Sequence, residues 1–235
     1  MIAAQEIELT PGEDPVPWDA RDAWLGAGLL FFVMLGLLVL LYFLPNLEMS
    51  LILAGSELAL LVPVWWLAVR KYGASWRTLG LRKFAPVALG IGCGLMILSW
   101  GFNLVYSLFL ALFNARAQPD FSPIFADASS PWLILVAGAV IAPIVEEIIF
   151  RGFIFAGFKA RYGWVKAAVL SSGLFAIIHF QPLAIIAIFL MGMIFAFLYH
   201  YSGSIWPAII MHMSTNLLAL GAALLLARFP ELAGV

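Results

Sequence analysis

About seven long apolar stretches run through this chain and constrain its fold more than any single motif does. A helix needs about 20 mostly apolar residues to cross the hydrocarbon layer of a membrane. The stretches that approach or exceed this length are residues 25–44, 51–69, 86–113, 132–155, 165–180, 183–199 and 205–227. Because backbone polar groups inside lipid need internal hydrogen bonds, we predict an all-α, polytopic membrane bundle of about seven transmembrane helices.

The composition excludes an ordinary soluble protein. Hydrophobic residues make up 64% of the 235 residues and charged residues 11%, whereas charged residues are roughly a quarter of soluble domains. The net charge of -1 comes without a basic stripe interleaved with aromatic residues, so we expect contact with the lipid bilayer and no nucleic-acid partner. Cys93 is the single cysteine, which excludes a disulfide framework and a cysteine metal cluster.

The chain begins with an acidic segment that also contains Pro11, Pro15 and Pro17. A secretory signal would begin with positive charge before a short apolar core. We therefore expect residues 1–22 to form a polar cytoplasmic tail and residues 23–235 to form a single membrane-embedded domain.

Positive charges gather on one side of the predicted membrane. The side that holds the N-terminus collects Arg21, Arg70, Lys71, Arg77, Arg82, Lys83, Lys159, Arg161 and Lys166. The opposite side has Arg116 and Arg228. The positive-inside rule therefore predicts a cytoplasmic N-terminus and a C-terminus across the membrane.

Three charged residues lie close together inside the apolar stretch 132–155. Charges at bilayer depth are costly and usually mark a functional site. Glu147 and Arg151 are four residues apart and share a helix face, so they can pair, while Glu146 is turned about 100° away from that face. Pro143 lacks a backbone N–H and should loosen or kink the helix just before these residues.

Two further polar pairs follow at helical spacing: Phe175 with His179, and His212 with Asn216. At a rise of 1.5 Å per residue, Glu146, His179, His212 and Asn216 lie about 12 to 24 Å from the predicted cytoplasmic helix ends. This range covers the middle of a hydrocarbon layer about 30 Å thick. The shared depth predicts one polar site within the membrane.

The three pairs, in this order on successive apolar helices, resemble the motifs of the CPBP or Abi family of CAAX prenyl proteases and bacteriocin-processing enzymes. Those motifs read Glu146-Glu147-x-x-x-Arg151, Phe175-x-x-x-His179 and His212-x-x-x-Asn216. The motif-bearing core covers residues 132–218. The resemblance implies an intramembrane endopeptidase whose catalytic core lies in the last four helices and encloses a polar cavity, open to the cytoplasm or sideways to lipid.

The resemblance also implies a role for each motif residue. Glu146 would be the general base, and His179 would help to hold and polarise the water. His212 and Asn216 would donate hydrogen bonds to the developing oxyanion, which is effective chemistry in a dry cavity. Glu147 and Arg151 would support the site structurally.

The expected substrate is a peptide segment of a membrane-associated protein, of a CAAX-like or bacteriocin-related kind. We expect no cofactor, but zinc is an alternative, because Glu146, His179 and His212 are acceptable ligand types. The soluble metalloprotease motif HExxH is absent.

Two other classes of protein keep polar residues inside a membrane. A non-catalytic immunity or scaffold protein of the same family would keep its function when Glu146, His179 or His212 is replaced by Ala. An ion-coupled transporter is disfavoured, because no paired inverted halves are visible in the sequence. We interpret Glu57, in the second apolar stretch, as a helix-packing contact in preference to a substrate contact or an interfacial residue.

Overall fold

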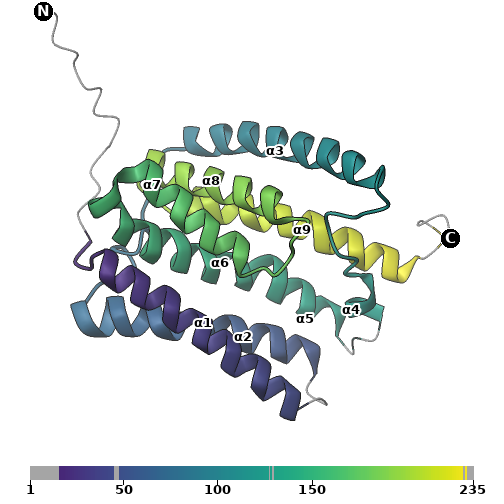
Figure 1. Ribbon diagram of the computed structural model, residues 1–235, viewed down its shortest axis with the longest axis horizontal. Coiled ribbons are helices and arrows are strands. Elements are labelled where there is room, and N and C mark those ends of the chain that lie inside the picture. Colours follow the sequence, from purple (N-terminus) through teal and green to yellow (C-terminus); the bar gives the residue numbers. More distant parts are fainter. Residues whose placement is uncertain (1–15, 45–47, 127, 129, 230, 232–235) are drawn as a thin grey trace, which may run out of the picture.

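The computed structural model describes residues 16–44, 48–126, 128, 130–229 and 231, and these fold into a bundle of helices (Figure 1). The separate long helices are α1 (Ala20–Phe43), α2 (Met49–Val64) with its π-helical continuation η1 (Trp65–Arg70), α3 (Val87–Ala111), α8 (Ile185–Ser202) and α9 (Trp206–Arg228). The short helix α4 (Ser122–Ala126) follows α3. An unbroken run of helical segments then follows, bent within α7: α5 (Pro131–Val136), η2 (Ala137–Ile141), α6 (Ala142–Glu147), η3 (Ile148–Phe155) and α7 (Ala156–Ile177). The described residues contain no strand, and the predicted all-α bundle is confirmed.

Six helices in the described part of the chain are long and apolar enough to cross a membrane. The longest, Pro131–Ile177, has 47 residues and measures about 70 Å at 1.5 Å per residue, more than twice a bilayer core. Gly163, with φ 74° and ψ 164°, breaks this helix into two legs. A positive φ of this kind favours glycine, and the break accounts for the two spans that the sequence predicts here. The chain is a multi-pass integral membrane protein.

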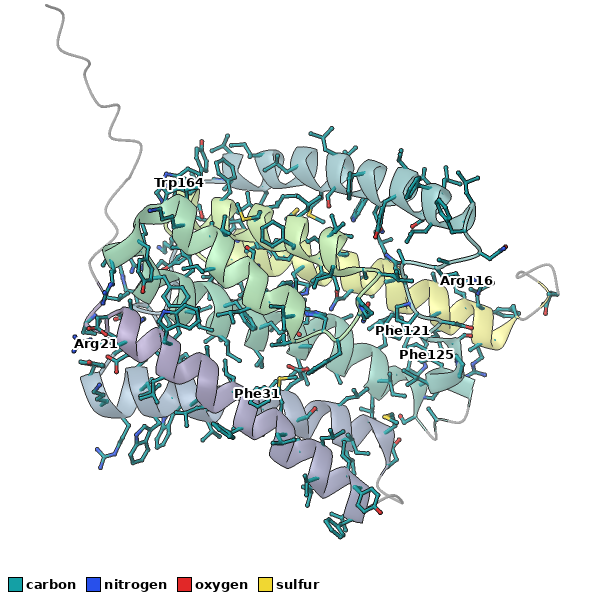
Figure 2. All side chains as sticks on the ribbon, in the orientation of Figure 1. Arg21, Phe31, Arg116, Phe121, Phe125 and Trp164 are labelled. Carbon is teal, nitrogen blue, oxygen red and sulfur yellow. The ribbon has the colours of Figure 1, made fainter. Side chains whose placement is uncertain are left out.

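The two ends of the bundle carry different residues. Figure 2 shows Arg21 and Trp164 at one end, and Arg116, Phe121 and Phe125 at the other. The first end also holds the start of α3 and the Gly163 break. The nine cations that the sequence analysis placed on the side of the N-terminus lie in or beside the segments at this end. We therefore call it the cationic end.

The last residues of the predicted N-terminal tail are packed against the bundle. Trp18 is buried, and its indole Nε1 donates to the backbone oxygen of Phe153 at 2.9 Å. Asp22 is buried in α1 and accepts a hydrogen bond from Lys71 Nζ at 2.6 Å, which raises the pKa of the Lys71 ammonium. The tail is therefore shorter than predicted, because an indole and a carboxylate find partners in the bundle. Residues 1–15 lie outside the described residues.

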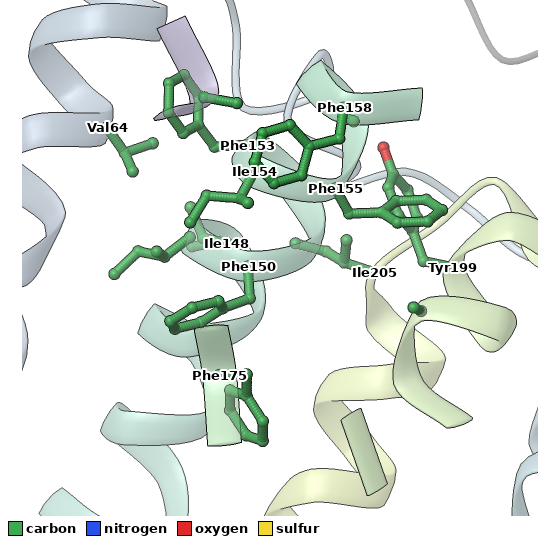
Figure 3. Close-up of a cluster of buried hydrophobic side chains, with 14 of the residues drawn as sticks. Val64, Ile148, Phe150, Phe153, Ile154, Phe155, Phe158, Phe175, Tyr199 and Ile205 are labelled. Carbon is green, nitrogen blue, oxygen red and sulfur yellow. The ribbon is translucent and has the colours of Figure 1, made fainter. Parts of the chain in front are cut away.

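The centre of the bundle is the π-helical segment η3. All eight of its residues are buried, and Figure 3 shows Phe150, Phe153 and Phe155 of this segment among the buried side chains of neighbouring helices. A helix that is buried on every side must lie in the middle of its bundle. Arg151, which belongs to η3, is thereby held far from lipid and from water.

The helix that carries the paired glutamates is irregular on both sides of them. The π-helical segments η2 and η3 flank α6, whose six residues include Pro143, Glu146 and Glu147. Pro143 cannot donate to the preceding turn, so a regular α-helix cannot continue through it. The predicted irregularity is present, and wide turns of this kind are frequent at functional sites.

Candidate active site

Arg151 and Glu147 form an ion pair at the centre of the bundle. Nη1 of Arg151 donates to Oε1 of Glu147 at 3.0 Å, and both side chains are fully buried. The guanidinium also lies over the rings of Phe175 and Phe195, 4.5 and 5.3 Å from their centroids. A buried charge needs a close partner, and Arg151 has both an anion and two aromatic faces.

Arg151 also connects α8 to this pair. Its Nη2 donates to the backbone oxygen of Gly192 at 3.0 Å. A Cβ atom at position 192 would lie 2.9 Å from Cβ of Ser172 and 3.2 Å from Nη2 of Arg151. Glycine is therefore needed at this position, because any side chain would push α8 away from α7 and from the guanidinium.

His212 lies between the two glutamates. Its Nδ1 is 3.0 Å from Oε1 of Glu147, and its Nε2 is 3.5 Å from Oε2 of Glu146. The imidazole stacks on Phe195 and meets Phe175 edge-on, so the ring orientation is held from two sides. Because the Glu147 carboxylate accepts from Nδ1, the Nε2 atom faces Glu146.

The two glutamates differ in their surroundings. The Glu147 side chain is fully buried and Oε1 binds both Arg151 and His212. The Glu146 side chain keeps 14% of its exposure, and within the described part of the protein its Oε2 has no hydrogen-bond partner. Oε2 of Glu147 also has no partner among these residues, but the Glu147 side chain is closed off from solvent, so Glu146 is the more accessible of the two glutamates.

His179 and Asn216 are each fixed by one backbone carbonyl. Nδ1 of His179 lies 2.7 Å from the backbone oxygen of Phe175, and a carbonyl accepts, so this nitrogen donates. In neutral His179 the other nitrogen, Nε2, then carries the lone pair. Nδ2 of Asn216 donates to the backbone oxygen of Gly138 in η2 at 2.9 Å, which leaves a second N–H of the amide for another acceptor.

A cavity of about 520 Å³ has His179 and Asn216 in its wall. Gln118, Phe121 and Gln181 also line it, and these residues follow the ends of α3 and α7 that lie away from the cationic end. Figure 2 shows Phe121 at that same end. This cavity therefore lies in the half of the bundle away from the cationic end, and its predicted opening to the cytoplasm or sideways to lipid stays a prediction.

The predicted site is divided into two adjoining parts. Glu146 and His212 are absent from the lining of the cavity that His179 and Asn216 face. The ring of Phe175 joins the parts, with its centroid 4.7 Å from that of His179 and 5.7 Å from that of His212. One turn of α9 separates His212 from Asn216. Glu146 thus contacts His212, whereas the cavity reaches His179 and Asn216.

The described residues do not form a three-ligand metal site. No group of three His, Cys, Asp or Glu side chains among them is arranged to hold a metal ion. Glu146, His179 and His212 therefore do not form a ready three-ligand group here, and we derive no step through a metal.

Glu57 of α2 is a further carboxylate near the site. It interacts electrostatically with Glu146, and its Oε2 is buried without a hydrogen-bond partner among the described residues. The sequence interpretation of Glu57 as a packing contact missed this neighbour. An acidic residue at bilayer depth was the available sequence signal for a role in the site. The packing of α2 against α6 could not be predicted from the spacing of residues along one helix.

Comparison with known proteins agrees with the motif resemblance. Residues 128–218 match a family described as Rce1-like, Type II CAAX prenyl endopeptidase Rce1-like. The chain is 34% identical over 84 residues to "Putative membrane peptidase YdiL" of Bacillus subtilis (strain 168), a match that covers 36% of this chain and 34% of that protein. It is 33% identical over 111 residues to an "Uncharacterized 24.3 kDa protein" of Escherichia coli, covering 44% of this chain and 51% of that protein. The chain thus spans from about a third to about half of the length of these relatives. No solved structure matches.

Proposed function

We propose that this chain is an intramembrane endopeptidase, because residues 128–218 match the Rce1-like family of Type II CAAX prenyl endopeptidases. Its reaction is hydrolysis of a peptide bond in a membrane-associated protein. The observation that carries this proposal is the difference between the two glutamates. Glu147 is fully buried and its Oε1 is bound by Arg151 and His212, whereas Glu146 keeps 14% of its side-chain exposure and has an acceptor oxygen beside His212.

Glu146 is the proposed general base. It removes a proton from a water molecule, whose oxygen then bonds to the carbonyl carbon of the substrate and converts it to a tetrahedral oxyanion. Neutral His179 accepts a hydrogen bond through Nε2 from water that enters by the cavity, because its Nδ1 is bound to a carbonyl. When the C–N bond breaks, the proton held by Glu146 passes to the leaving amine. The products are a new carboxyl terminus and a new amino terminus.

His212 and Asn216 are the proposed oxyanion donors. The second N–H of the Asn216 amide is available, since the first is bound to Gly138. His212 contributes from Nε2 when this atom is protonated, while Glu147 holds Nδ1 on the opposite side of the ring. Donors that are fixed before the reaction stabilise the developing charge without reorganisation.

The proposed orientation has the N-terminus in the cytoplasm, because the cationic end carries most of the positive charges. The cavity then lies in the half of the bundle away from the cytoplasm. A substrate segment would reach His179 and Asn216 from that side or from within the bilayer.

The test compares new protein termini in cells that express the wild type or Glu146→Gln. We expect at least one membrane-associated protein to be cleaved in the wild type and to stay full length in the variant. His179→Ala should give the same result. If cells with Glu146→Gln produce every terminus that wild-type cells produce, the chain acts as a scaffold and the proposal fails.

A further inference from the structure

One face of α3 presents a row of polar side chains to the cavity. Ser99, Asn103 and Ser107 are spaced four residues apart, so they share a helix face, and all three line the cavity. On the outward face of the same helix, Leu98 and Val105 are 71% and 67% exposed. The helix therefore turns its polar face inward.

The middle residue of this row has an unused hydrogen-bonding group. Oδ1 of Asn103 is buried and has no hydrogen-bond partner among the described residues. A buried polar atom without a partner is costly, and such atoms in native structures call for an explanation. A ligand that donates a hydrogen bond into the cavity would satisfy it.

The row has the dimensions and chemistry of a short peptide backbone. From Ser99 to Ser107 the helix rises about 12 Å, and an extended peptide covers that distance with about four residues. A peptide unit offers one N–H and one C=O, and inside a membrane both need partners. A carboxamide and a hydroxyl can each donate and accept, so they match either group.

The row also faces the residues proposed for catalysis. His179 and Asn216 line the same cavity, and α3 packs against α8 and α9, which form the wall beside them. A peptide held along α3 would therefore run past His179 and Asn216. Trp100 and Leu104 also line the cavity and supply apolar surface for substrate side chains.

We propose that Ser99, Asn103 and Ser107 form a backbone-binding rail, which holds the substrate as an extended peptide next to His179 and Asn216. This inference rests on the proposed function for the identity of the ligand. The rail positions the substrate and takes no part in bond cleavage. It binds peptide backbone and not side chains, so it tolerates many sequences.

The test is a binding experiment on the full-length Glu146→Gln protein in detergent micelles. The probe is a mixture of random decapeptides with a benzophenone at the central position, and crosslinked residues are mapped by mass spectrometry. We expect crosslinks on residues 99–107 of α3 and on the facing cavity wall. Asn103→Leu in the same background should lower the crosslinking yield about fivefold to tenfold, as expected for one lost hydrogen bond. Asn103→Ser should keep most of it.

The matched control is Val105→Leu, which places leucine on the outward face of the same helix. It should leave the yield unchanged, and equal thermal melting temperatures would show that all variants are folded. Unchanged crosslinking in Asn103→Leu, or no crosslinks to the cavity, overturns the proposal. Labelling of the cavity by a photoactivatable phosphatidylcholine, without labelling by the peptides, also overturns it and assigns the cavity to lipid.

Kinetics separate this inference from the proposed function. The substrate is the internally quenched decapeptide that the wild type cleaves fastest. For this peptide Asn103→Leu should raise the KM about fivefold to tenfold above that of the wild type and leave kcat nearly unchanged. An unchanged KM overturns the rail. Equal cleavage by the wild type and by Glu146→Gln instead overturns the proposed function, while the crosslinking result still decides the rail.

Discussion

Oε1 of Glu147 lies 3.0 Å from Nδ1 of His212 and accepts a hydrogen bond from the imidazole. The same oxygen lies 3.0 Å from Nη1 of Arg151. One fully buried carboxylate therefore fixes both a proposed catalytic ring and a buried cation. Its loss should affect the stability of the fold as well as the reaction.

Glu147→Leu should destabilise the protein by about 3 to 5 kcal/mol, because it leaves the Arg151 guanidinium buried without an anion. The double variant Glu147→Leu with Arg151→Met should lose much less stability, since no unpaired charge remains. Thermal unfolding in detergent measures both. A double variant that is less stable than Glu147→Leu would show that the pair does not act as a unit.

Glu57→Gln should raise the stability of the protein by about 1 kcal/mol, because it removes a carboxylate that interacts unfavourably with Glu146 and whose buried oxygen has no partner in the described part of the chain. The unfolding temperature in detergent is the measurement. Ser56→Ala, one position away on the same helix, is the control and should not raise it. A clear fall in stability with Glu57→Gln would mean that the carboxylate makes a favourable contact.

Helical spacing was enough to predict part of this site. The Glu147–Arg151 pair depends only on residues four apart on one helix, and the shared depth of the motif residues depends only on the rise per residue. The contact of His212 with Glu147 depends on how α9 is rotated about its own axis, which depth does not determine. The approach of Glu57 to Glu146 depends on which helices are neighbours. For the same reason the sequence predicted one pocket, where the structure separates Glu146 from the cavity that His179 faces.

The orientation of the bundle predicts which end a membrane-impermeant reagent can reach. In a Cys93→Ser background, Gln118→Cys should react with an impermeant maleimide added to intact cells, because Gln118 is exposed near the cavity end. Arg161→Cys, exposed near the cationic end, should react only after the cells are opened. The reverse pattern would place the N-terminus outside the cytoplasm.

Removal of metal ions should leave the proposed reaction unchanged, because the mechanism uses Glu146 and His179 to activate water. The purified protein is treated with a chelator, and cleavage of the decapeptide probe is followed before and after treatment. A loss of activity that added zinc restores would contradict this prediction and would support the zinc alternative.

The most direct test of the account is the turnover number of purified Glu146→Gln against that of the wild type, measured on the same peptide. The substitution keeps the size of the side chain but removes its basicity, and we expect kcat to fall at least about a hundredfold, with an unchanged melting temperature. A folded Glu146→Gln protein with a kcat close to that of the wild type would contradict the assignment of Glu146 as the base.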